Sequence, residues 1–131
     1  WARQNNSGLS ANPHKGTGMS HSSGVFTFPS TGYWMVYWNG GVYIANNDSG
    51  VGFNLRVTAD NGSNWTSVSN IDEGDSGGHH GHMTDMTYLD ITDVSNQKVA
   101  FQLGSLTSGN KLKGSSSQLM SNAMFIRLGD T

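Results

Sequence analysis

Residues 79–82, with the sequence HHGH, form the only local cluster of side chains that could bind a transition metal. Neutral imidazoles are good ligands for iron, nickel and zinc. On a β-strand, His80 and His82 would share one face because they lie two residues apart. The neighbouring glycines, Gly77 and Gly78, instead favour a solvated histidine-rich loop. Both interpretations, a metal site and a surface loop, stay open from the sequence.

Other polar groups indicate no catalytic centre. Asp72, Glu73 and Asp75 lack the spacing of a known calcium loop, so we expect a solvated acidic turn. Glu73 is the only glutamate and falls in a loop-like segment, which argues against the paired carboxylates of glycoside hydrolysis. No Gly-x-Ser-x-Gly elbow lies between a strand and a helix. We therefore expect a protein that is not an enzyme and requires no cofactor.

Three aromatic residues are candidates for stacking on sugars: Trp1, Tyr43 and Trp65. Trp65 is the best of them because it comes shortly after a hairpin signal at residues 60–63, with the sequence DNGS. The alternative for each is ordinary packing. The sequence offers Trp65 as a ligand-binding residue without deciding between the two.

Composition limits the classes of partner. The 131 residues suffice for one domain. A net charge of −2 with 12% charged residues provides no basic surface, so nucleic acid is not expected as a partner. Cysteine is absent, and no apolar stretch approaches the roughly 20 residues that span a membrane, so no membrane insertion is expected. The chain begins with Trp1 and shows no leader, which predicts a processed product or part of something longer.

Hydrophobic patterning predicts an all-β protein. Gly, Ser, Asn and Thr dominate, and helix-forming residues never persist for three turns. Alternating or continuous apolar runs predict about eight to ten short strands, with turns about every 8–12 residues, as in sandwiches and barrels. The firm strands are expected at 24–28, 33–38 continuing through 42–44, 51–58, 65–68, 83–91, 99–103 and 123–128, with loops over 72–81 and 105–117.

Residues 33–38, YWMVYW, form the most apolar of these strands. Every position is apolar, so both faces are expected to be buried. A sandwich strand has only one face toward its own core. Either the odd-numbered or the even-numbered residues must therefore be covered by something else. A neighbouring chain is the simplest cover, and a loop of the same chain is the alternative.

Three motifs follow one another in a known order: residues 23–37 (SGVFTFPSTGYWMVY), Leu89–Ile91 with 96–101 (NQKVAF), and 123–128 (AMFIRL). Together they resemble tumour-necrosis-factor-like and complement-head-like jelly rolls over roughly residues 14–131. Asn96-Gln97 stands where that family has a Gly-Asp turn. The cysteine-free composition and the Gly-, Ser- and Asn-rich loops also resemble bacteriophage fibre tips.

The resemblance implies a jelly-roll β-sandwich of TNF-like type that forms a homotrimer around a three-fold axis. It places Trp34, Val36 and Trp38 in the core. The trimer interface would consist of Met35, Tyr37, Met86 and Tyr88, helped by the final strand. Residues 1–22 would be an extended lead-in with a first short strand, and residues 23–131 the single jelly-roll head.

The function that the resemblance implies is a non-catalytic head of a virus (phage) fibre or extracellular filament, for attachment or assembly. Its expected location is extracellular or on the virion surface. Its partners would be a cell-surface receptor or glycan, or other fibre or filament subunits. The alternatives are a secreted complement-head-like ligand module and a carbohydrate-active sandwich domain.

A trimer would also bear on the histidine pair. Counting back by two from Tyr88 and Met86 places His82 and His80 on the same face as the expected interface. Three copies would then bring six imidazoles near the axis, enough for an octahedral transition metal. Such a metal would tie three chains together and would be released in acid as the ligands protonate.

Overall fold

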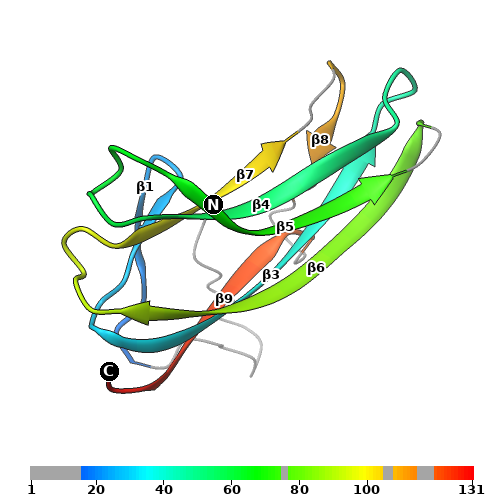
Figure 1. Cartoon of the computed structure of the whole chain (residues 1–131). Coiled ribbons are helices and arrows are strands. Elements are labelled where there is room, and N and C mark those ends of the chain that lie inside the picture. The colour runs from blue at the N-terminus through cyan, green and yellow to red at the C-terminus, as the bar shows by residue number, and fades with distance from the viewer. Residues whose placement is uncertain (1–15, 75–76, 105–107, 115–119) are drawn as a thin grey trace.

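The computed structural model describes residues 16–74, 77–104, 108–114 and 120–131, and every regular element within these residues is a β-strand. The all-β prediction is confirmed, and the strands form two antiparallel sheets that pack as a sandwich (Figure 1). Residues 1–15, which include Trp1 and most of the predicted lead-in, lie outside the described residues.

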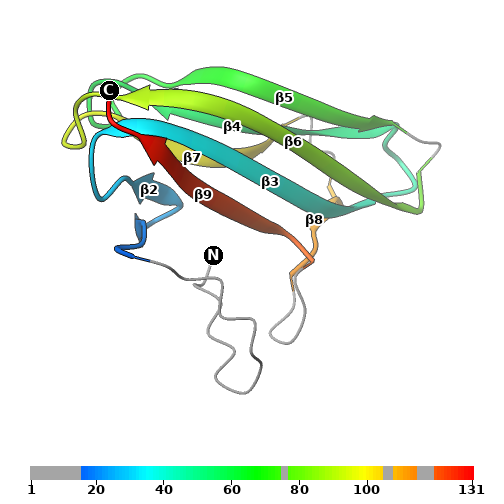
Figure 2. The ribbon, with the colours of Figure 1, turned by 90° about the horizontal axis from the view of Figure 1, so that it is seen from below.

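The larger sheet has five strands in the order β1-β2-β7-β4-β5. The bounds are β1 Ser20–Ser22, β2 Val25–Thr27, β7 Lys98–Gly104, β4 Gly50–Thr58 and β5 Thr66–Gly74. The smaller sheet has four strands, and its long central strand β3 (Gly32–Ile44) pairs with β6 (His79–Ile91) along its whole length. β9 (Asn122–Gly129) and β8 (Lys111–Leu112) pair with the other side of β3, and Figure 2 shows β6, β3 and β9 side by side as one layer.

Three of the strand pairs are nested within one another. β4 and β5 pair as a hairpin. The strands that flank this hairpin in the sequence, β3 and β6, pair with each other, and so do the next strands outward, β2 and β7. The central part of the chain is thus one long antiparallel ribbon, closed by the loop between β4 and β5. The ribbon contributes to both sheets, because β3 and β6 lie in the smaller sheet and the other four strands lie in the larger one.

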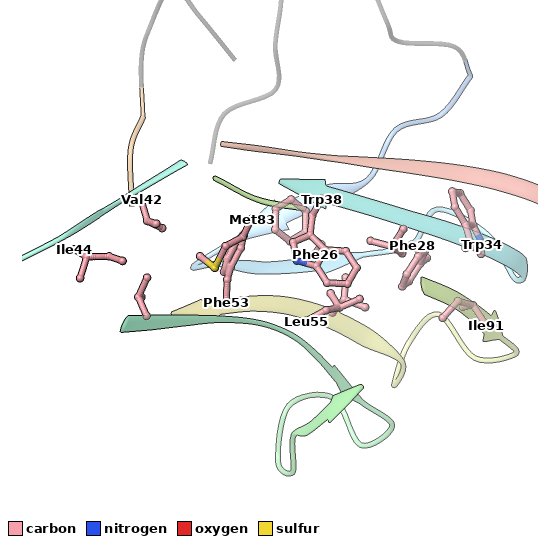
Figure 3. Close-up of a cluster of buried hydrophobic side chains, with 13 residues drawn as sticks. Phe26, Phe28, Trp34, Trp38, Val42, Ile44, Phe53, Leu55, Met83 and Ile91 are labelled. Atoms are coloured by element: carbon pink, nitrogen blue, oxygen red, sulfur yellow. The ribbon is translucent and has the colours of Figure 1, made fainter. Parts of the chain in front are cut away.

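The core lies between the two sheets and consists of side chains at alternate positions of their strands. On β3 it takes Trp34, Val36 and Trp38, as the resemblance implied, and on β4 it takes Phe53 and Leu55. Figure 3 shows Trp34, Trp38, Phe53 and Leu55 in the space between the layers. Tyr33, Met35 and Tyr37 therefore point away from the core.

Strand β3 crosses Gly40 and Gly41 without interruption, where the sequence suggested a ragged continuation. A Cβ on Gly40 would lie 2.8 Å from Cδ1 of Phe53, so the aromatic ring packs directly on the β3 backbone. Glycine by itself weakens a strand, and an aromatic ring from the opposite sheet stabilises the strand at this position.

The predicted loops over 72–81 and 105–117 were too long. β5 runs to Gly74 and β6 begins at His79, so only a short connection separates them. The polar composition of this segment wrongly predicted a loop, because β5 and β6 are edge strands and an edge strand with one face in solvent accepts polar residues. The second segment contains β8, while residues 105–107 and 115–117 lie outside the described residues.

Candidate functional site

The outer face of the four-stranded sheet carries a group of apolar side chains. The register aligns Met35 with Tyr88 and Tyr37 with Met86 across one strand pair, and β9 adds Met124 and Ile126 on the other side of β3. Residues directly opposite in an antiparallel pair share a face. We call this set, Met35, Tyr37, Met86, Tyr88, Met124 and Ile126, the apolar platform.

The apolar platform is open to solvent in the single chain. Tyr88 is 62% exposed, and Met86 and Met124 are each 45% exposed. Tyr33 and Leu128 continue the exposed apolar surface toward one end of the sheet. Large contiguous apolar patches on a soluble protein mark interaction sites. The described part of the chain therefore has a surface suited to covering by another molecule.

The four residues predicted for the interface, Met35, Tyr37, Met86 and Tyr88, thus lie together on one exposed face. Sequence reasoning named the final strand only in general and missed Met124 and Ile126 individually. The alternation of side chains along the final strand could have identified them. Ala123 and Phe125 pack against the core, so the alternate residues must point outward.

His80 and His82 lie on this same outer face, at the far end of the sheet from Tyr88. They pair with Tyr43 and Gly41 of β3, which confirms the strand parity expected for them. The His80 and Tyr43 rings have centroids 5.1 Å apart. His82 leans over Gly41, where a Cβ would lie 3.5 Å from its imidazole.

Two lysines near His80 were missed by the sequence reasoning. Lys111 and Lys113 line a shallow depression of about 530 Å³ together with Tyr43 and His80. Lys111 lies directly opposite Tyr43 in the β3–β8 pair. Cationic neighbours disfavour a bound cation by charge repulsion. Within one chain, the described residues contain no group of three His, Cys, Asp or Glu side chains that could hold a metal, so a metal on a three-fold axis stays a prediction that needs other chains.

The acidic segment takes part in strand structure. Asp72 and Glu73 belong to β5, and the Glu73 side chain lies across Gly81 of β6, where a Cβ would be 2.5 Å from Cγ of Glu73. Asp75 lies outside the described residues. Glu73 thus packs along the edge where β5 and β6 of the two sheets meet.

Trp65 lines a second depression, of about 300 Å³, on the outer face of the five-stranded sheet. The other lining residues are Ser20, His21, Ser22, Val25, Thr27, Asn61, Gly62 and Lys98. The indole Nε1 of Trp65 donates a hydrogen bond to the carbonyl oxygen of Gly62 at 3.0 Å. The tryptophan named from the sequence therefore borders a hollow that has several polar groups.

The loop that carries Trp65 is organised around Asp60. The backbone N–H of Asn64 and the hydroxyl of Thr58 donate to Oδ1 of Asp60 at 2.8 and 2.7 Å, and the Asn64 amide donates to Oδ2 at 2.6 Å. These hydrogen bonds, the Asn64 backbone bond first, lower the pKa of Asp60 from 3.8 to about 2. The ionised carboxylate is thus part of the folded loop.

Replacing Asp60 with asparagine is expected to lower the melting temperature near neutral pH. Because the folded pKa lies below the unfolded value, the carboxylate stabilises the fold above pH 3.8, and this stabilisation is lost as the pH falls toward about 2. The difference in melting temperature between wild type and Asp60→Asn should therefore shrink over that range. Asp130→Asn is the control, since the exposed Arg127–Asp130 ion pair contributes little. A difference that stays constant with pH would contradict this role of Asp60.

Within the described residues, no helix has the length and apolarity needed to cross a membrane. In comparisons with known proteins, no protein-family model and no curated protein matches the chain.

Proposed function

We propose that this chain is a non-catalytic, homotrimeric head of jelly-roll, TNF-like type, and that it serves attachment or assembly at the tip of a virus fibre or extracellular filament. The observation that carries the proposal is the apolar platform on the outer face of β6, β3 and β9. A sandwich that exposes aromatic and methionine side chains on the face opposite its core needs a partner for that face.

The strand order supports the jelly-roll assignment. A jelly roll is a long antiparallel ribbon wrapped so that its strands are shared between two sheets. The nested pairs β4–β5, β3–β6 and β2–β7, with β9 added beside β3, have this arrangement. The motifs on which the resemblance rests fall on β2 and β3, around the β6–β7 turn and on β9.

A second copy of the chain is the proposed cover for the apolar platform. The six residues of the platform are all methionine, tyrosine or isoleucine, which suits a buried homo-oligomeric interface. A face-to-face pair of chains would form a closed dimer, but the resemblance implies three chains that meet around an axis. In that arrangement β6, β3 and β9 face the axis and the five-stranded sheet faces outward. The proposed attachment role implies a location that is extracellular or on the virion surface, with the outer sheet facing the environment.

Sedimentation equilibrium at micromolar concentration tests the assembly directly. We expect the mass of three 14.0 kDa chains. A stable 14.0 kDa monomer at these concentrations would refute the trimeric head, whatever the protein binds.

A further inference from the structure

We infer that the depression beside Trp65 binds a saccharide. This inference rests on the attachment role proposed above and names the class of ligand that the head would recognise. A sugar ring has an apolar C–H face that packs on an indole and hydroxyl groups that need hydrogen-bond partners. The structure provides both within one hollow of about 300 Å³, near the lower end of the usual size for ligand pockets.

The indole is held in place before any ligand arrives. Its Nε1–H bonds to Gly62, and Nη2 of Arg56 donates to the Trp65 carbonyl oxygen at 3.2 Å. Nη1 of Arg56 in turn donates to Oε1 of Gln102 on β7 at 3.0 Å. A preorganised aromatic side chain loses little conformational freedom on binding, so more of the stacking energy contributes to affinity.

The loop below the indole is equally fixed. Thr58 is 3% exposed although it faces away from the core beside Lys98, because the loop folds over it. Its Oγ1 accepts from the backbone N–H of Gly62 at 3.0 Å, and the Asn61 N–H donates to the carbonyl oxygen of Asn96 at 3.0 Å. The loop is therefore attached to its own strand and to the turn before β7.

Polar groups surround the hollow beside the indole. Nζ of Lys98 donates a hydrogen bond to Oδ1 of Asn61, which leaves the Asn61 NH2 group and the remaining ammonium protons for a ligand. Thr27, Ser20 and Ser22 provide hydroxyl groups from β2 and β1, which pair next to β7. Together these groups offer both donors and acceptors to sugar hydroxyls.

The depression lies on the five-stranded sheet, whereas the apolar platform lies on the four-stranded sheet. Assembly through the platform would therefore leave the depression open to solvent. A trimer would present three copies facing outward, and simultaneous binding of several sugars on one cell surface would raise the overall affinity. Weak individual sites are then sufficient for attachment.

Three variants test the site on a printed array of neutral and acidic oligosaccharides from bacterial and animal cell surfaces. Trp65→Ala removes the stacking surface and should weaken binding at least about tenfold, as when other aromatic anchors are truncated. Asn61→Gly removes the amide but suits the backbone, because Asn61 has a φ of 57°, a conformation that glycine adopts freely. Val68→Ser is the control, since Val68 is an exposed apolar residue of the same sheet outside the depression.

The inference is supported if wild type and Val68→Ser bind the same saccharides and both Trp65→Ala and Asn61→Gly lose them while keeping the wild-type circular dichroism spectrum. It is overturned if wild type binds no saccharide on the array, or if both site variants bind as wild type does. Sedimentation of the same samples separates this result from the assembly proposal. A trimer without saccharide binding refutes only the site, and a monomer that binds through Trp65 refutes only the trimer.

Discussion

Replacing Met86 with aspartate is expected to leave the chain folded and to convert the proposed trimer into monomers. Met86 is 45% exposed in the single chain, so an aspartate there stays solvated before association. In the assembly its carboxylate would be buried against Tyr37 and the apolar side chains of a neighbour. An unpaired buried charge costs about 3–5 kcal/mol. At about 1.4 kcal/mol per tenfold, a single such penalty weakens association more than about a hundredfold.

Sedimentation velocity with circular dichroism measures both parts of this expectation. Val68→Asp is the matched control, because Val68 is 42% exposed but lies on β5 in the opposite sheet. The control should remain trimeric. A Met86→Asp protein that sediments like wild type and melts at the same temperature would show that the apolar platform is not the interface.

Replacing Trp38 with alanine is expected to cost about 3–5 kcal/mol of stability, as for other large-to-small substitutions in a core. The Trp38 side chain is fully buried, and its ring centroid lies 6.0 Å from that of Phe101 on β7. Typical domains are stable by only about 5–15 kcal/mol, so the variant should lose a large fraction of its stability. Urea denaturation at one fixed protein concentration gives the change, because the apparent stability of an oligomer depends on concentration.

Trp38→Phe separates packing from hydrogen bonding. The indole Nε1 of Trp38 is buried and has no hydrogen-bond partner among the described residues. Phenylalanine retains most of the aromatic packing and removes that unsatisfied donor, so its cost should be well under that of alanine. Equal losses for the two variants would mean that the indole N–H contributes to stability.

The sequence predicted which residues of β3 face the core because the side-chain period of a strand is two and the family resemblance supplied the parity. The same rule correctly placed Met35 and Tyr37 on one face, and Met86 and Tyr88 on one face, with His80 and His82 following. It could not show that Tyr37 lies opposite both Met86 and Met124, because register between strands depends on turn geometry and on contacts far apart in the chain.

The depression beside Trp65 was less predictable than the platform. Local sequence identified the hairpin and the aromatic residue, but Lys98 and Ser20 come from strands that only the tertiary fold brings to that loop. Local polarity also misassigned the ends of β5 and β6, where a histidine- and glycine-rich segment becomes a strand by pairing with Tyr43 and Ile44 of β3. Tertiary context overrides weak local preference at such edges.

The nested ribbon has a consequence for the order in which the chain folds. The β4–β5 hairpin joins residues close in sequence, so it loses the least entropy on closure, and each pair outward encloses a longer loop. Folding is expected to begin at the hairpin that carries Trp65 and to proceed toward β2 and β7, at the slow rates of proteins rich in non-local pairs. β9 docks on β3 only after residues 122–129 have been synthesised, and it completes the apolar platform. If the chain assembles through the apolar platform as proposed, association follows the docking of β9, so each chain would meet its partners already folded.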